Sequence, residues 1–175
     1  MKRIIFVILC LCTMMSFLPS QSSAIMIGMG TEELTRESGL VIRGEVSNVE
    51  AQWSEDRKTI ITRANITITN ILKGETISNM IAVEYEGGEI GEIGLRVSDV
   101  SPLSTGEDVI LFLNKSAESR IIGDVHNIVG KAQGKYTISK DGIAGKSGFS
   151  VISGESIIDN NIPVDKLIDK IKRVK

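Results

Sequence analysis

Residues 40–53, LVIRGEVSNVEAQW, and residues 59–72, TIITRANITITNIL, decide the fold. In both stretches apolar side chains alternate with polar ones, and in the first the alternation changes phase after Ser47-Asn48. A phase change within one long strand is typical of a β-bulge, and Gly44 permits a sharp bend there. The second stretch is rich in β-branched residues, which favour strands. Joined by a short polar loop, the two stretches predict a long, curved β-hairpin.

Period-two alternation gives each strand a shared face and predicts further strands along the chain. The most apolar run, at 108–113, indicates a central strand, and Asp141-Gly142 between two alternating segments is a strong hairpin signal. In the long hairpin the shared faces carry Leu40, Ile42, Gly44, Val46, Val49, Ala51 and Trp53, and then Thr62, Ala64, Ile66 and Ile68. The other expected strands are 80–85 with Ile81, Val83 and Tyr85 inward, 95–97, 120–122, 135–139 and 143–144, and 86–94 is expected to be a loop.

Two helices are expected. Thr31 can cap a short helix over residues 32–38, whose early glutamates suit the positive end of a helix. Near the C-terminus, Pro163 suits a first helical position and apolar residues recur with 3.6-residue spacing. This stripe predicts a helix within 160–175 that packs on the sheet, with a membrane-surface helix and a partner-binding helix as alternatives. The stripe comprises Val164, Leu167, Ile168, Ile171 and Val174.

The first 24 residues have the pattern of a cleavable export signal. A positive start at Lys2-Arg3 precedes an apolar run over 4–18, and Ser22-Ser23-Ala24 supplies the small residues that a signal peptidase reads. The run is shorter than the roughly 20 apolar residues that span a bilayer, which argues against an uncleaved anchor. Both cysteines, Cys10 and Cys12, lie inside this segment. Each directly follows a leucine, whereas a lipoprotein needs small residues just before its acylated cysteine, which argues against a lipoprotein. We therefore expect a signal peptide over 1–24 and a periplasmic or extracellular protein without disulfides.

Composition limits the partners of the exported chain. Cleavage after Ala24 leaves 151 of the 175 residues, a length that suits one domain. Losing Lys2 and Arg3 reduces the 20 basic side chains to 18 against 22 acidic ones, a net charge of −4. Nucleic-acid binding needs concentrated Lys and Arg, so we expect no nucleic-acid partner. We also expect no transmembrane segment in the mature chain.

These elements together predict a mainly all-β domain. Its expected form is a small OB-like barrel, antiparallel and closed or partly open, because closure removes exposed strand edges. A short N-terminal helix and an amphipathic C-terminal helix accompany it. The expected organisation is a signal peptide over 1–24, a lead-in with the short helix over 25–38, the barrel domain over 39–159 and the C-terminal helix over 160–175.

Three strings of sequence carry a family resemblance. They are GLVIRGEVSNVE at 39–50, ITITNILKG at 66–74 and GEDVILFL at 106–113. They resemble a loose group of exported bacterial proteins with OB-type barrels, similar to the netrin-like module of tissue metalloproteinase inhibitors. The resemblance covers about residues 39–139 and rests on turns and core strands. Those inhibitors engage a metal through an N-terminal cysteine, which this mature chain lacks, so the resemblance implies a fold and no site residues.

No catalytic or metal-binding cluster stands out. His126 is the single histidine and has only Asp124 near it in sequence, which is too few ligands for zinc, so it is expected to be a surface or loop histidine. The glycine-rich stretch 86–94 has glutamates that would repel phosphate, and its spacing is not that of a calcium loop. We treat it as a flexible candidate interaction loop. Its residues are Gly87, Gly88, Glu89, Gly91, Glu92 and Gly94.

The functional expectation follows from a well-patterned core without a reactive cluster. We expect an exported, non-enzymatic binding or interaction module without cofactor or metal, whose partner is another exported or surface protein. One alternative is a secreted peptidase inhibitor resembling the netrin-like module. The second alternative is a hydrolase that uses a pair of its many carboxylates.

Overall fold

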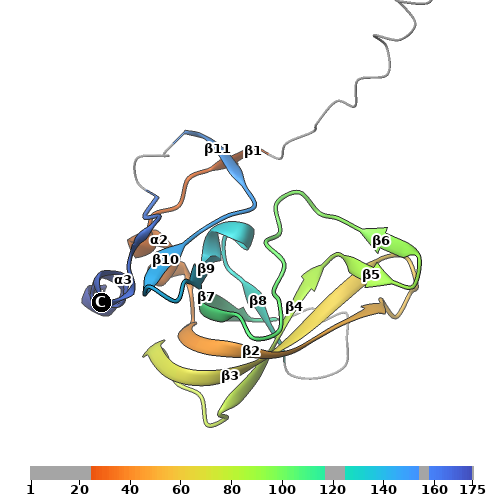
Figure 1. Cartoon of the computed structure of the whole chain (residues 1–175), viewed down its shortest axis with the longest axis horizontal. Helices are drawn as coiled ribbons and strands as arrows, with labels where there is room; N and C mark the ends of the chain where they lie inside the picture. The colour runs from red at the N-terminus through yellow and green to blue at the C-terminus, as the bar shows by residue number, and fades with distance from the viewer. Residues whose placement is uncertain (1–24, 117–124, 154–157, 175) are drawn as a thin grey trace, which may run out of the picture.

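The computed structural model describes residues 25–116, 125–153 and 158–174 (Figure 1). An eight-stranded sheet dominates it, in the order β12-β10-β9-β7-β2-β3-β4-β8. Because β8 pairs with β7 as well as with β4, five of these strands close into a ring. The ring strands are β2 (Leu40–Trp53), β3 (Ile60–Lys73), β4 (Met80–Glu86), β7 (Asp108–Lys115) and β8 (Val125–Ile128). The predicted mainly β fold is confirmed, and part of its large sheet forms a ring.

The ring is not wholly antiparallel, which corrects the expectation. β8 runs parallel to β4 and antiparallel to β7. Beyond β7 the sheet continues outward through three short strands, β9 (Lys135–Ile138), β10 (Ile143–Gly145) and β12 (Ile162–Pro163). The β9–β10 pairing confirms the hairpin predicted at Asp141-Gly142.

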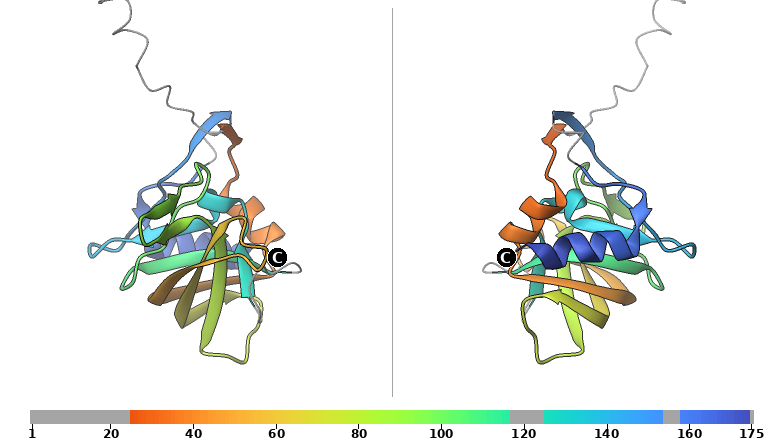
Figure 2. Two further views of the ribbon diagram at one scale, coloured as in Figure 1. Left: turned by 90° about the vertical axis from the view of Figure 1, so that its right-hand side faces the viewer. Right: turned by 90° about the vertical axis from the view of Figure 1, so that its left-hand side faces the viewer.

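The long β2–β3 hairpin is bent as its sequence predicts. Its register shifts at three places in β2, one of them between Val46 and Asn48, where the alternation changes phase. A side chain at Gly44 would place its Cβ atom 2.5 Å from the carbonyl oxygen of Thr67, so only glycine allows this close approach of the strands. The bend lets the hairpin wrap around the interior, as the two side views in Figure 2 show.

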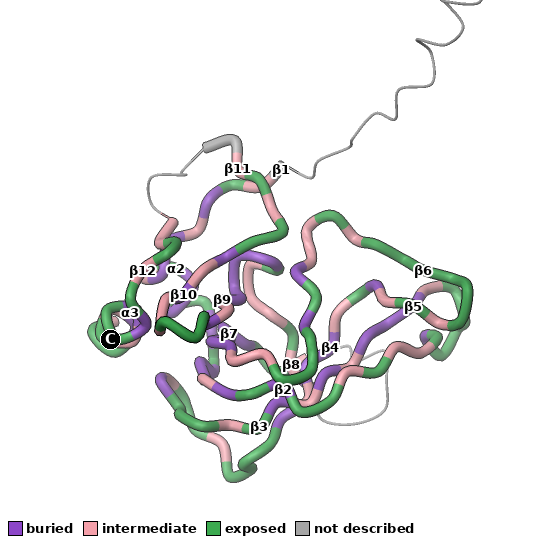
Figure 3. The backbone as a smooth tube through the Cα atoms, viewed as in Figure 1, coloured by how far each residue is buried: buried purple, intermediate pink, exposed green. Residues whose placement is uncertain are grey.

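Two hydrophobic cores lie on opposite faces of β2 and β7. Inside the ring, Ile42 and Leu111 pack with Ile66 and Val83. On the outer face, Val41, Ile110 and Phe112 pack with Tyr136, α2 (Thr31–Glu37) and α3 (Val164–Arg173). Neighbouring residues of one strand therefore serve different cores, which explains why residues 108–113 form an almost unbroken apolar run. Figure 3 shows the buried segments concentrated in these central strands.

The helices cover the outer core. Val164, Leu167 and Ile171 of α3 are buried there, so the stripe packs on the sheet as predicted. Residues 160–163 precede the helix, which begins at Val164 because Pro163 is its N-cap residue. No helix within the described ranges is long and apolar enough to cross a bilayer.

The expectation that Thr31 caps the helix is wrong, because the N-cap lies one residue earlier. Gly30 is the N-cap of α2, and Thr31 is its first helical residue. The Thr31 hydroxyl instead lies 3.0 Å from the Tyr136 hydroxyl and donates a hydrogen bond to Asp159. At the other end of α2, the ammonium group of Lys73 donates to the carbonyl oxygens of Thr35 and Ser38, which stabilises the helix terminus.

Several short elements differ from the expectation. The predicted loop at 86–94 is mostly a hairpin, β5 (Gly88–Ile90) and β6 (Ile93–Leu95), and β6 replaces the strand expected at 95–97. A parallel two-stranded ribbon of β1 (Ile25–Ile27) and β11 (Ser150–Ser153) was not expected. A 3-10 turn, η1 (Lys131–Gly134), precedes β9. The predicted signal peptide at 1–24 and the strand at 120–122 lie outside the described residues.

Candidate functional site

An open groove of about 900 Å³ lies between the β5–β6 hairpin and the connection 96–104 that leads toward β7. Tyr85 and Thr62 contribute to its lining from the ring, and Leu95 contributes from the hairpin. A second hollow of about 310 Å³ adjoins it and shares Tyr85 and Val97 with it. Figure 1 shows the connection arching away from β6 and returning to the sheet, so that it forms one side of this region.

The groove includes part of the candidate interaction loop. Gly87, Gly88, Glu89 and Gly94 line it. Gly91 and Glu92 form the two-residue turn between the paired residues Ile90 and Ile93, and they are not part of the lining. Two-residue hairpin turns favour glycine with positive φ, and Gly91 has φ +61°. The string Ile-Gly-Glu-Ile is the local signal that could have identified this hairpin.

Gly88 sets how closely the hairpin approaches the ring. Its φ is +128°, a conformation that favours glycine. A Cβ atom there would lie 2.9 Å from the Cβ of Ala51 and would also collide with the hydroxyl of Thr62. The hairpin therefore crosses the β2–β3 hairpin with its main chain in direct contact, and this contact defines one wall of the groove.

Tyr85 and Thr62 connect the walls to the ring. The Tyr85 hydroxyl accepts a hydrogen bond of 3.1 Å from the main-chain N–H of Leu103. The Thr62 hydroxyl donates one of 2.5 Å to the carbonyl oxygen of Gly87. Burial raises the pKa of Tyr85, so its phenol stays neutral and keeps its capacity to donate. The two side chains thus hold opposite walls of the groove.

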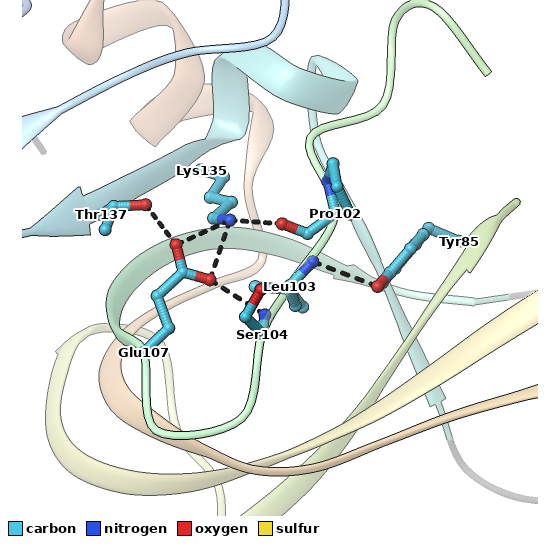
Figure 4. Close-up of polar contacts among 7 residues, drawn as sticks. All are labelled: Tyr85, Pro102, Leu103, Ser104, Glu107, Lys135 and Thr137. Carbon is cyan, nitrogen blue, oxygen red and sulfur yellow. Dashed lines mark hydrogen bonds and ion pairs between the residues drawn. The ribbon is translucent and has the colours of Figure 1, made fainter. Parts of the chain in front are cut away.

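A buried ion pair fixes the wall at residues 102–104, as Figure 4 shows. Lys135, only 5% exposed, donates a 2.5 Å hydrogen bond to the carbonyl oxygen of Pro102 and lies 2.9 Å from the carboxylate of Glu107. That carboxylate also accepts hydrogen bonds from the main-chain N–H of Ser104, at 3.1 Å, and from the hydroxyl of Thr137, at 2.5 Å. Because both charges are compensated, the network holds this wall in one position.

The start of the connection is fixed separately. The carbonyl oxygen of Asp99 accepts a 3.0 Å hydrogen bond from the main-chain N–H of Ala132. The Asp99 carboxylate forms an ion pair with Lys131, which also lines the smaller hollow. The connection is therefore attached to η1 at Asp99 and to the ring at 102–104, and the groove is preformed along its length.

The other candidate residues do not join this site. His126 lies in β8, partly buried, which corrects the expectation of a surface or loop position, and Asp124 lies outside the described residues. Within the described ranges, no group of three or more His, Cys, Asp or Glu side chains could hold a metal ion. Hydrogen bonds from Ser54 and the Lys58 main chain lower the pKa of Asp56. Burial raises the pKa of Asp159, but hydrogen bonds from Lys170 and Thr31 outweigh it and lower the pKa overall.

Sequence reasoning missed the connection 96–104 and Thr62. The connection has no periodic pattern, and its path depends on contacts with residues distant in sequence, such as Tyr85 and Lys135. No local signal encodes those contacts. Comparison with protein-family models gives no match, and comparison with curated protein sequences gives none either.

Proposed function

We propose that this protein is an exported, non-enzymatic binding module that holds an extended segment of another exported or surface protein in the groove beside the β5–β6 hairpin. The observation that carries the proposal is the preformed groove between a hairpin and a wall fixed by the buried Lys135–Glu107 pair. A preformed site loses less conformational entropy on binding than a flexible one. Among the described carboxyl groups, the resolved pKa shifts at Asp56 and Asp159 are both downward, whereas a glycosidase-type general acid needs a raised pKa.

The residues that line the groove suit the binding of an extended polypeptide. Gly88 and Gly94 line the groove without side chains, so an incoming strand can approach the main chain closely there. Gly87 is buried, and its N–H and C=O groups are already bonded to Ile60 and Thr62. Leu95 and Val97 add apolar surface. Alternate side chains of a bound strand would then meet apolar and polar positions in turn, as in other cases of strand addition.

We further propose that the five-stranded ring is an OB-type barrel related to the netrin-like module. An OB barrel is a partly open, five-stranded Greek-key barrel, and the ring of β2, β3, β4, β8 and β7 supports that assignment. Export through a cleaved signal over residues 1–24 remains part of the proposal. N-terminal sequencing of the protein recovered from the exported fraction tests it, with Ile25 as the expected first residue.

A pair of matched substitutions tests the groove. Leu95 is 37% exposed in the groove wall, whereas Ile77 is fully exposed between β3 and β4 and does not line the groove. Wild-type protein, Leu95→Glu and Ile77→Glu are each used as bait with the exported fraction of the source cells. We expect a partner captured by the wild type and by Ile77→Glu to be lost with Leu95→Glu, because a buried charge opposes binding.

The mode of binding needs a second measurement on the captured partner. Synthetic peptides that tile its sequence are added to the pure protein, and amide hydrogen exchange is measured over residues 86–104. Protection of this range by one peptide supports the proposal. Equal capture by all three baits, or protection confined to other segments, contradicts it, and stoichiometric inhibition of a captured protease would favour the inhibitor alternative.

A further inference from the structure

Lys146 is a buried amine that is not part of the groove lining, although Gly148, two residues later, contributes to that lining. It follows β10, and its side chain is 8% exposed. Its Nζ atom lies 4.3 Å from the centre of the Tyr136 ring. Among the described residues this Nζ atom has no hydrogen-bond partner, although a charged ammonium group normally requires several.

Charged groups from every neighbouring element are already engaged with one another. Lys170 of α3 lies 2.8 Å from the carboxylate of Asp159 and 3.2 Å from that of Glu32 in α2. Asp159 also accepts the hydrogen bond from Thr31, whose oxygen lies 3.0 Å from the Tyr136 hydroxyl. Asp159 and the face of Tyr136 favour a protonated Lys146, while Lys170 and burial oppose it. Burial is the largest effect and lowers the pKa of Lys146 to about 7.

The backbone of Lys146 lies at the base of the β1–β11 ribbon. The side chain of Asn160 accepts a 2.7 Å hydrogen bond from its main-chain N–H and donates a 3.3 Å hydrogen bond to its carbonyl oxygen. Four residues later, Ser150 begins β11, which pairs with β1. Figure 2 shows this ribbon projecting from the rest of the molecule. A two-stranded ribbon has little stability of its own, so it depends on its attachment.

We propose that Lys146 is a pH-sensitive latch that holds the β1–β11 ribbon when its amine is neutral and releases it when the amine is protonated. The neutral amine remains packed over Tyr136 and keeps the main chain of Lys146 against Asn160. The ammonium group gains hydration by leaving this position, and its flexible four-carbon chain can reach the surface if the backbone moves with it. Acid therefore opens the ribbon.

Amide hydrogen exchange tests the latch. Protection of residues 25–28 and 146–152 is measured between pH 5.5 and 8.5 and corrected for the intrinsic pH dependence of exchange. We expect protection in the wild type to fall at least tenfold on acidification, with a midpoint near neutral pH. Lys146→Met, which keeps the length and removes the charge, is expected to stay protected throughout. Lys146→Arg is expected to be unprotected throughout.

Control variants assign the effect to this one amine. Lys140, exposed in the neighbouring β9–β10 turn, is changed to Met, and His126, the single histidine, is changed to Gln. Both variants should keep the wild-type transition. If Lys146→Arg does not fold, the exchange profile of Lys146→Met alone tests the proposal. A flat wild-type profile, or a Lys146→Met variant that still opens in acid, overturns the proposal, and so does a Lys146 amine that titrates in the ordinary lysine range by NMR.

Discussion

Two lysines, buried almost equally, hold two regions of this molecule in different ways. Lys135 beside the groove is 5% exposed and Lys146 below the ribbon is 8% exposed. Lys135 has a carboxylate and a carbonyl oxygen within hydrogen-bond distance, whereas the Lys146 amine has no hydrogen-bond partner among the described residues and lies 4.3 Å from the centre of an aromatic ring. The difference teaches that burial alone does not define the role of a lysine. Lys135, whose charge is compensated by Glu107, fixes the groove wall. Lys146 has no such compensation among the described residues, and we propose that it responds to pH.

The largest expected effect comes from removing the compensation of Lys135. Glu107→Gln leaves a buried ammonium group without its counter-ion, which is expected to cost about 3–5 kcal/mol of unfolding free energy. Urea unfolding at pH 7.5 measures this loss. Asp108→Asn is the control, because its ion pair with Arg43 is about one-third exposed and should contribute less than about 1 kcal/mol. Equal losses in the two variants would show that the buried Lys135–Glu107 pair contributes no more than a partly exposed ion pair.

A smaller effect on the unfolding free energy is expected when pH changes the protonation of Lys146. Its pKa is lowered from 10.5 to about 7 in the folded protein, so between these values the unfolded chain binds more protons. Unfolding free energy should therefore rise with pH above about 7, by at most about 1.4 kcal/mol per pH unit. Urea unfolding between pH 7 and 9.5 measures the slope, and Lys146→Met should reduce it. Parallel slopes in wild type and variant would show that Lys146 is charged when folded.

The smallest expected effect concerns the hydrogen bond that joins the groove wall to the ring. Tyr85→Phe removes the acceptor for the main-chain N–H of Leu103 and should cost about 1 kcal/mol. The same variant should increase hydrogen exchange at residues 102–104, where Glu107 and Lys135 still hold the neighbouring groups. Unchanged exchange in this range would show that the ion pair fixes the wall without help from Tyr85.

The elements that sequence predicts well are those with a local period. β2 and β3 alternate between buried and less buried positions over part of their length, and the predicted bounds of β2 match the observed ones. The β5–β6 hairpin was missed because its strands have three residues each and glycines obscure their alternation. The groove and the buried Lys146 arise from contacts between distant segments, such as Lys135 with Pro102, and no nearest-neighbour pattern records them.

The use of both faces of β2 and β7 has a consequence for folding fidelity. A slip of one residue in strand pairing exchanges the side chains of the two faces. Here Val41 would enter the ring interior and Ile42 would meet the helices, so one apolar side chain would replace another. In a sheet with one solvated face, by contrast, the same slip would bury polar side chains and expose apolar ones. Polarity therefore opposes slippage less at these positions, and the close strand approach at Gly44 and the register shifts of the β2–β3 hairpin oppose it instead.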